Sequence, residues 1–206
     1  MKFGLQKSFR AVKDFLLFSC IISKRVRNTE APLDRDAENY KNFLDGDDSA
    51  FDRLMESLFY RLVYFVDGIV GDTFAAEDIA VDVFAELIAN KKRYNFKTSL
   101  KTYVFMLGKS RALNYIKHRK VLDITELSGA EGLPEEKAEL EKKVLQSERE
   151  RILGDALDML PQDKRMALHL IYFEDMSYEQ AARVMGVEKK YLDNLLQRAK
   201  KELRSL

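Results

Sequence analysis

Residues Met176–Leu203 read MSYEQAARVMGVEKKYLDNLLQRAKKEL, and this stretch decides how the rest of the chain is interpreted. Ser177, followed three residues later by Gln180, forms the pattern of a capping box, which predicts a helix beginning directly after the serine. Gly186 marks the end of this helix, because glycine adopts the left-handed conformation of a helix cap without a Cβ clash. A second helix is predicted to begin near Glu188, whose charge suits a helix N-terminus.

This second predicted helix has two faces of opposite character. One face is apolar at helical spacing and predicts packing against a core: Leu192, Leu196, Ala199 and Leu203. The rest carries polar groups suited to phosphates and base edges: Lys189, Lys190, Tyr191, Asn194, Gln197 and Arg198. A capped short helix, a glycine turn and a basic second helix together predict a helix-turn-helix DNA reader. The alternative is a solvated amphipathic helix in an ordinary bundle.

The composition favours an all-α protein of one or two domains. The chain has 206 residues, of which 46% are hydrophobic, with only three prolines and nine glycines. Apolar residues recur at helical spacing, and no stretch alternates as a strand would. The single cysteine, Cys20, excludes an internal disulfide and suits a reducing, cytoplasmic compartment. His118 and His169 show no metal-ligand spacing, so we expect neither a metal nor another cofactor.

The net charge of +1 hides two blocks of opposite sign. Residues 47–90 hold ten acidic residues against two arginines, whereas residues 91–120 hold ten Lys or Arg residues and no acid. Blocks of opposite sign usually indicate different partners, since a plain solvated surface mixes the two signs.

The acidic block is predicted to form two amphipathic helices. The first covers Phe51–Val66 and is broken by Gly68 and by Gly71 with Asp72. The second is capped by Thr73 and runs to about residue 90. Its buried face is predicted to comprise Ile79, Ala80, Val83, Phe84, Leu87 and Ile88. Its exposed side carries Asp78, Asp82 and Glu86, spaced by four. This acidic line predicts either a solubilising surface or a docking face for a basic partner.

The basic block begins with KKRYNFKTS at residues 91–99, between two predicted helices. Basic groups follow a phosphate backbone while aromatic rings stack on bases, a combination that commonly holds single-stranded nucleic acid. The alternative is that Tyr94 and Phe96 pack into the core, which we expect for one of the two. A helix follows from Ser99 to about His118.

Changes in composition divide the chain into four parts. They are a basic N-terminal extension (1–35), a first helical domain (36–120), an acidic linker with a helical end (121–150) and a second, four-helix domain (151–206). The extension contains the apolar run Phe15–Ile22, which is too short to span a bilayer, although peripheral membrane contact is an alternative for it. The second domain is predicted to contain helices over Ile152–Leu160 and Gln162–Phe173 before the helix-turn-helix.

Two blocks resemble bacterial RNA polymerase sigma factors of the extracytoplasmic-function (ECF) subfamily. Residues 48–121 resemble region two through Ala76–Ile79, Val83–Leu87, Ser99–Tyr103 and Arg111–Ile116. Residues 153–206 resemble region four through Leu160-Pro161, Ile171–Glu174 and Met176–Ala182. The blocks follow in the family's order and have a linker between them.

The resemblance implies a protein that binds RNA polymerase core and directs recognition and melting of promoter DNA. Region two in this family docks on a coiled coil of the largest polymerase subunit, so Asp78, Asp82 and Glu86 become candidate polymerase contacts. The melted minus-ten element would be held by Arg93, Tyr94, Asn95, Phe96, Lys97, Lys109, Arg111 and Asn114. The second helix of region four would read the minus-thirty-five duplex. An anti-sigma factor is a frequent further partner in the family.

The recognition helix departs from the family, because Asp193 and Leu195 stand where Lys and Arg are common. Lys190, Asn194 and Arg198 therefore become the preferred contacts. Two other functions stay open: a stand-alone helix-turn-helix regulator that acts without polymerase, and a sigma-like adaptor that has lost DNA contact. The sequence has no nucleophile–base pair, phosphate loop or metal cluster, so we expect neither an enzyme nor a small-molecule substrate.

Overall fold

The computed structural model describes residues 34–126, 156–157 and 159–205, and every regular element in these ranges is a helix, which confirms the all-α class. The elements are α2 (Arg35–Leu44), α3 (Asp48–Val70), α4 (Thr73–Ala89), α5 (Leu100–Glu126), α7 (Gln162–Leu168), the π-helical turn η1 (His169–Phe173), α8 (Tyr178–Met185) and α9 (Lys189–Leu203). The predicted extension, up to residue 33, and residues 127–150 of the predicted linker lie outside the described residues. No helix in the described part of the chain has the length and apolar composition needed to cross a membrane.

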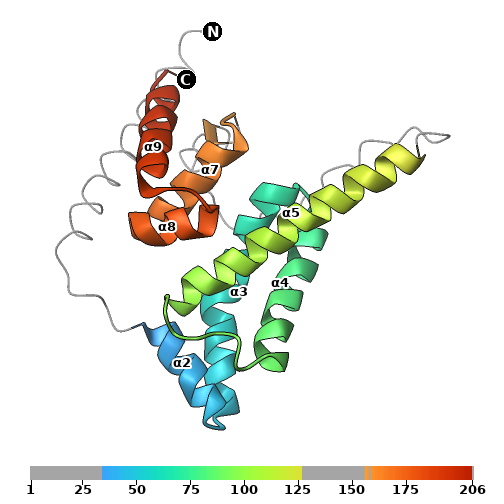
Figure 1. Ribbon diagram of the computed structural model, residues 1–206, viewed down its shortest axis with the longest axis vertical. Coiled ribbons are helices and arrows are strands. Elements are labelled where there is room, and N and C mark those ends of the chain that lie inside the picture. Colours follow the sequence, from blue (N-terminus) through green and yellow to red (C-terminus); the bar gives the residue numbers. More distant parts are fainter. Residues whose placement is uncertain (1–33, 127–155, 158, 206) are drawn as a thin grey trace, which may run out of the picture.

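The first group of helices is organised around α3, which packs against α2, α4 and α5 (Figure 1). Leu54, Leu58 and Leu62 of α3 are fully buried at helical spacing, as its apolar pattern predicts. The predicted break at Gly68 is wrong. The helix continues to Val70 and ends at Gly71, whose φ of 69° supplies the left-handed cap.

The cap of α4 also differs from the prediction by one residue. The N-cap is Asp72, whose carboxylate accepts a hydrogen bond from the Ala75 N–H at 3.1 Å, and Thr73 is the first helical residue. A short aspartate side chain satisfies one of the N–H groups that the first turn leaves unpaired, so either residue type is a chemically reasonable cap.

The helix α2 is an element that the sequence patterns did not predict. Its N-cap Asp34 accepts from the Ala37 N–H at 3.1 Å and, with its second oxygen, from the Leu100 N–H at 3.0 Å. One carboxylate therefore caps two helices that are far apart in the sequence. Tyr40 of α2 is fully buried, and its hydroxyl donates to the carbonyl oxygen of Leu87 at 2.9 Å. These contacts fix α2 against the start of α5 and the end of α4.

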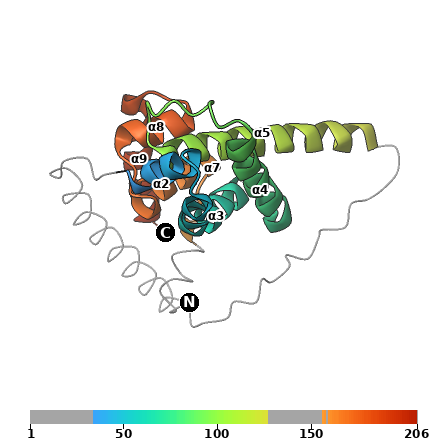
Figure 2. The same cartoon turned by 90° about the horizontal axis from the view of Figure 1, so that it is seen from below.

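The helix α5 approaches α3 closely at Gly108. A Cβ placed on Gly108 would lie 2.7 Å from Cδ1 of Leu62 and 3.3 Å from Cγ2 of Val66. The absence of a side chain is therefore what allows the two helices to meet here. Beyond this contact α5 projects away from the bundle (Figure 2). It continues to Glu126, past the end predicted near His118 and six residues into the segment predicted as linker.

The second group of helices comprises α7, η1, α8 and α9, and it contains the predicted helix-turn-helix. Ser177 Oγ accepts from the Gln180 N–H at 3.2 Å, and Gln180 Oε1 accepts from the Ser177 N–H at 2.8 Å, which confirms the capping box. The helix α8 has the predicted bounds, and Gly186 closes it with a φ of 68°. The second helix of the motif, α9, begins at Lys189, after the short turn at residues 186–188. The helix predicted over Ile152–Leu160 lies largely outside the described residues.

The helix predicted over Gln162–Phe173 is present but changes its hydrogen-bond pattern midway. It begins as α7 and widens into the π-helical turn η1 from His169 onward. The Glu174 N–H, for example, donates to the His169 carbonyl oxygen five residues earlier, at 3.1 Å.

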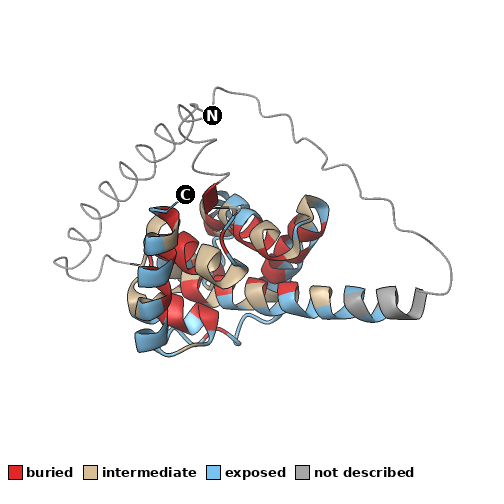
Figure 3. Cartoon of the chain, turned by 90° about the horizontal axis from the view of Figure 1, so that it is seen from above, coloured by how far each residue is buried: buried red, intermediate tan, exposed pale blue. Residues whose placement is uncertain are grey.

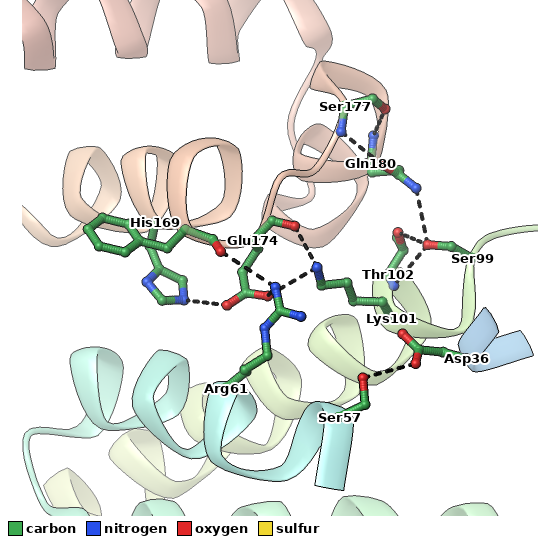
Figure 4. A network of polar contacts seen from close by, with 11 residues as sticks. Asp36, Ser57, Arg61, Ser99, Lys101, Thr102, His169, Glu174, Ser177 and Gln180 are labelled. Atoms are coloured by element: carbon green, nitrogen blue, oxygen red, sulfur yellow. Dashed lines mark hydrogen bonds and ion pairs between the residues drawn. The ribbon is translucent and has the colours of Figure 1, made fainter. Parts of the chain in front are cut away.

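The two groups of helices pack on each other, with α8 against α5 and α7 against α3. Buried positions line the inner sides of both groups, whereas residues 113–119 of α5 are exposed or partly exposed (Figure 3). Glu174 lies at this contact and is only 3% exposed (Figure 4). Its Oε2 is 2.8 Å from Nη2 of Arg61 and 3.3 Å from Nζ of Lys101, while its Oε1 is 3.4 Å from Nε2 of His169. We call Glu174, Arg61, Lys101 and His169 the seam cluster.

Burial and charge act in opposite directions on the acids near these cations. Burial raises the pKa of Glu174, but the hydrogen bond from His169 and the charges of Lys101 and Arg61 outweigh it, so the pKa lies below the ordinary 4.5. Burial dominates at Asp36 and raises its pKa, although Ser57 donates to it at 3.1 Å. The Glu174 carboxylate therefore stabilises the folded chain above pH 4.5, and this contribution is lost as the pH falls through its lowered pKa.

A pH series on Glu174→Gln tests this assignment. At neutral pH we expect the variant to lose about 2 kcal/mol of unfolding free energy, because the charge-assisted contacts of a buried group are removed. The difference from the parent should stay constant down to about pH 4.5 and shrink only as the pH falls further, through the lowered pKa of Glu174, where the parent carboxyl becomes neutral as well. Urea unfolding followed by circular dichroism measures both proteins. A difference that stays constant in this lower range as well would contradict a charged Glu174.

Candidate nucleic-acid interface

The acidic line on α4 is divided by the structure. Asp78 and Asp82 are exposed, with the Asp82 side chain 66% accessible, whereas the Glu86 side chain is 11% accessible. Glu86 receives Arg111 Nη2 at 2.6 Å and also pairs with Arg93, and Arg111 Nη1 lies 3.3 Å from Asp82 Oδ2. The basic block thus neutralises one end of the line, and the end at Asp78 faces solvent.

An apolar stripe runs beside these acids. Phe74, Val81 and Ile88 are 71%, 54% and 46% exposed, and their spacing of seven residues places them on one face of α4. The prediction that Ile88 belongs to the buried face is therefore wrong. Exposed large apolar residues in a row, flanked by charges, are typical of a surface that packs against another helix. The spacing of seven was present in the sequence and could have identified the stripe.

The basic loop places its two aromatic rings differently. Tyr94 is 4% exposed and its hydroxyl donates to the Thr98 carbonyl oxygen at 2.6 Å, so this ring is a core residue. Phe96 is 47% exposed, with its ring centre 4.6 Å from that of Tyr94. The backbone of Phe96 has a φ of 59°, which is unusual for a bulky residue and is typical of positions held for a function. Asn95 and Lys97 on either side are exposed.

The predicted contacts on α5 are only partly available. Asn114 is exposed. Arg111 is occupied by the acids of α4, as described above. Lys109 donates from Nζ to the carbonyl oxygen of Met185 at 2.5 Å, and burial lowers the pKa of its ammonium group. The predicted strand-binding residues therefore comprise an open set (Asn95, Phe96, Lys97 and Asn114), the paired cations Arg93, Lys109 and Arg111, and the buried Tyr94.

The recognition helix exposes every residue predicted to contact the duplex: Lys189, Lys190, Tyr191, Asn194, Gln197 and Arg198. Leu195, which stands at a position where a cation is common in the family, is 5% exposed and belongs to the core. Asp193 accepts from Gln197 Nε2 at 3.1 Å, and Lys189 pairs with Glu179 of α8. Because Leu195 is buried, it adds no apolar surface to the outer face of α9, and that face stays polar and mainly basic.

Sequence and structure comparisons agree with this arrangement. Residues 150–203 match the family model "Sigma-70, region 4". The chain is similar to the RNA polymerase sigma factor YlaC of Bacillus subtilis (strain 168), with 24% identity over 63% of this chain and 75% of that protein. It is also similar to the ECF RNA polymerase sigma factor SigM of the same organism, with 24% identity over 69% and 85% of the two chains.

A solved structure shares the fold. The sigma factor RpoE from Bartonella quintana, crystallised with the anti-sigma factor NepR, matches with a TM-score of 0.56 and 22% identity, covering 75% of this chain and 94% of that one. Residues 150–203 therefore carry a sigma-70 region-four domain. Over about two thirds of its length, the chain is similar in sequence to RNA polymerase sigma factors, one of them of the ECF group, and it shares the fold of a solved sigma factor.

Proposed function

We propose that this protein binds RNA polymerase core and directs promoter recognition, promoter melting and transcription initiation. One observation supports the proposal: the chain exposes two polar surfaces of different geometry. The loop at Phe96 combines an exposed ring with cations, which suits unpaired bases, and α9 presents a polar, basic helix face, which suits a major groove. A protein that reads a duplex element and also holds a melted strand needs both kinds of surface.

The acidic end of α4 is the proposed polymerase contact. Asp78 and Asp82 lie beside the stripe formed by Phe74, Val81 and Ile88. A partner helix with apolar residues at a spacing of seven and basic flanks would bury the stripe and pair with the acids. Glu86 contributes by orienting Arg93 and Arg111, with which it pairs.

The minus-ten contacts are proposed for the loop and α5. Phe96 stacks on an extruded base, and stacking on an aromatic side chain is worth about 1–3 kcal/mol per base. Asn95 and Lys97 flank Phe96 in the loop, and Asn114 lies further along α5; all three are exposed and offer hydrogen-bonding or charged groups to the melted strand. Tyr94 supports Phe96 from the core, since the centres of the two rings are 4.6 Å apart.

Regulation by an anti-sigma factor is a further part of the proposal. It is supported by the crystallised complex of RpoE with NepR, a sigma factor of similar fold bound to such a partner. The proposed site of action is in the cytoplasm, where polymerase and promoter DNA are found, and the proposed role is non-catalytic.

Charge reversal on α9 tests the proposed promoter contact. In a transcription assay with core polymerase and a genomic promoter library, we expect Lys190→Glu with Arg198→Glu to reduce specific transcripts about tenfold or more. The slope of log affinity against log salt should become shallower by about 0.9 for each phosphate contact removed. Co-purification with core polymerase should be unchanged, because α9 lies away from the proposed polymerase contact.

The matched control is Lys41→Glu with Arg204→Glu. It changes the net charge by the same amount as the α9 variant, at exposed positions in α2 and at the end of α9. This control should keep its transcripts. Unchanged transcription by the α9 variant would favour the adaptor function instead. Duplex binding by the parent without any polymerase association would favour the stand-alone regulator.

A further inference from the structure

The second group of helices lies directly on α5, the helix that carries part of the proposed strand-binding surface. The helix α8 packs on the N-terminal half of α5. Gln180 Nε2 donates to Ser99 Oγ at 3.1 Å, and Lys109 reaches the carbonyl oxygen of Met185. Lys101 donates to the carbonyl oxygen of Glu174 at 2.5 Å. The helix-turn-helix therefore occupies Lys109 and covers the start of α5.

This closed arrangement is incompatible with simultaneous reading of both promoter elements. The minus-ten and minus-thirty-five elements are about 25 base pairs apart, which is roughly 85 Å along the duplex at ~3.4 Å per base pair. Helices in direct contact, as α8 and α5 are here, have axes only about 10 Å apart. The two groups of helices must therefore separate before both elements are bound. The chain between Glu126 and Ala156 allows a span of up to about 100 Å when extended.

We propose that the seam cluster holds the chain in this closed state, that the closed state withholds Lys109 from DNA, and that Arg61 and Glu174 set how readily the chain opens. The part of this inference that concerns DNA rests on the proposed function. The part that concerns opening rests on the seam cluster alone.

The charges at the seam explain why this cluster controls opening. Glu174 is nearly inaccessible to solvent, and both of its partners from the first group of helices, Arg61 and Lys101, are cations (Figure 4). Removing one of them leaves a buried carboxylate with less compensation, which disfavours the closed state. After opening, Glu174 regains water, and Arg61 and Lys101 keep Asp36 as a nearby anion. The open state therefore holds no isolated buried charge at the seam, so a modest change shifts the equilibrium.

Energy transfer between dyes on the two groups of helices measures opening without polymerase or DNA. The dyes are attached at Glu56→Cys on α3 and Arg183→Cys on α8, both exposed, in a Cys20→Ser background. We expect Arg61→Gln to lower the ratio of closed to open chains about tenfold. The matched control is Arg53→Gln, an arginine of the same helix that pairs with Asp47 within the first group. It should retain the energy transfer of the parent.

Glu174→Gln is the second variant and removes the charge from the opposite side of the seam. Arg61 has a 39% accessible side chain on α3, so its variant tests the proposal even where Glu174→Gln lowers the helix content seen by circular dichroism. Both variants should bind a fluorescent single-stranded oligonucleotide of mixed sequence several-fold more tightly than the parent, because Lys109 is released.

The outcomes separate the two parts of the inference. Parent-like energy transfer in a folded Arg61→Gln variant would overturn the role of the seam cluster. Opening without tighter oligonucleotide binding would overturn the withholding of Lys109. Opening with tighter binding, but with no polymerase-dependent transcript from either protein, would overturn the proposed function and leave the closed state standing.

Discussion

Replacement of Gly108 by valine is expected to lower the free energy of unfolding by about 3 kcal/mol, near the upper end of what overpacking a core costs. A Cβ alone would lie 2.7 Å from Leu62 Cδ1, and Leu62 is fully buried, so its side chain has little room to move. The two methyl groups of valine enlarge this clash. The alternative to a rotamer change is separation of α5 from α3, which exposes Val66 and its neighbours.

Gly68→Val is the matched control, since Gly68 is also a helical glycine but a Cβ placed on it would meet no heavy atom within 4 Å. Its unfolding free energy should change by less than about 1 kcal/mol. The valine side chain meets no clash in the folded chain, and it lowers the conformational entropy of the unfolded chain. Urea unfolding of both variants and the parent gives the comparison. Equal effects of the two valines would show that α3 and α5 do not depend on a close approach at Gly108.

Replacement of Phe96 by alanine is expected to weaken capture of the melted promoter strand by about tenfold or more. This corresponds to the loss of one stacked base, about 1–3 kcal/mol. The core should be unaffected, because Phe96 is half-exposed and the buried Tyr94 keeps its hydrogen bond to Thr98. Binding of polymerase with this protein to a fluorescent non-template strand measures the loss. Promoter opening should fall in the same proportion.

Two further variants control the Phe96 experiment. Phe96→Tyr keeps a ring for stacking and should restore most of the binding. Tyr60→Ala removes a more exposed aromatic side chain, 76% accessible, from α3 and should have no effect on strand capture. Equal losses from Phe96→Ala and Tyr60→Ala would show that general surface hydrophobicity, and not stacking at the basic loop, holds the strand.

Local chemistry made the helix-turn-helix predictable from sequence. Ser177, Gln180 and Gly186 act within a few residues of one another, so their hydrogen bonds and backbone conformations follow from their spacing. The same reasoning failed at Gly68, because packing of α3 outweighs the modest cost of a glycine inside a helix. It also missed α2, whose anchor Tyr40 depends on a carbonyl group 47 residues away.

The residues of the candidate site divide in the same way: the environment of some follows from local spacing, and that of others depends on tertiary contacts. The exposure of the predicted face of α9 follows from helical spacing, because Leu192, Leu195 and Leu196 turn the opposite side toward the core. The engagement of Lys109 and Arg111 does not follow from spacing. Their partners come from a different helix in each case, and only the tertiary arrangement brings Met185 and Glu86 within reach.

The π-helical turn η1 gives the seam a geometric origin. An α-helix advances about 100° per residue, so the wider turn delays the rotation of the chain just before Glu174. Shortening this turn by a single residue would restore ordinary helical phase and swing the Glu174 side chain to another side of the axis, away from Arg61. A one-residue insertion or deletion here would therefore change how tightly the two groups of helices associate, although every charged residue of the seam cluster would be retained in the sequence.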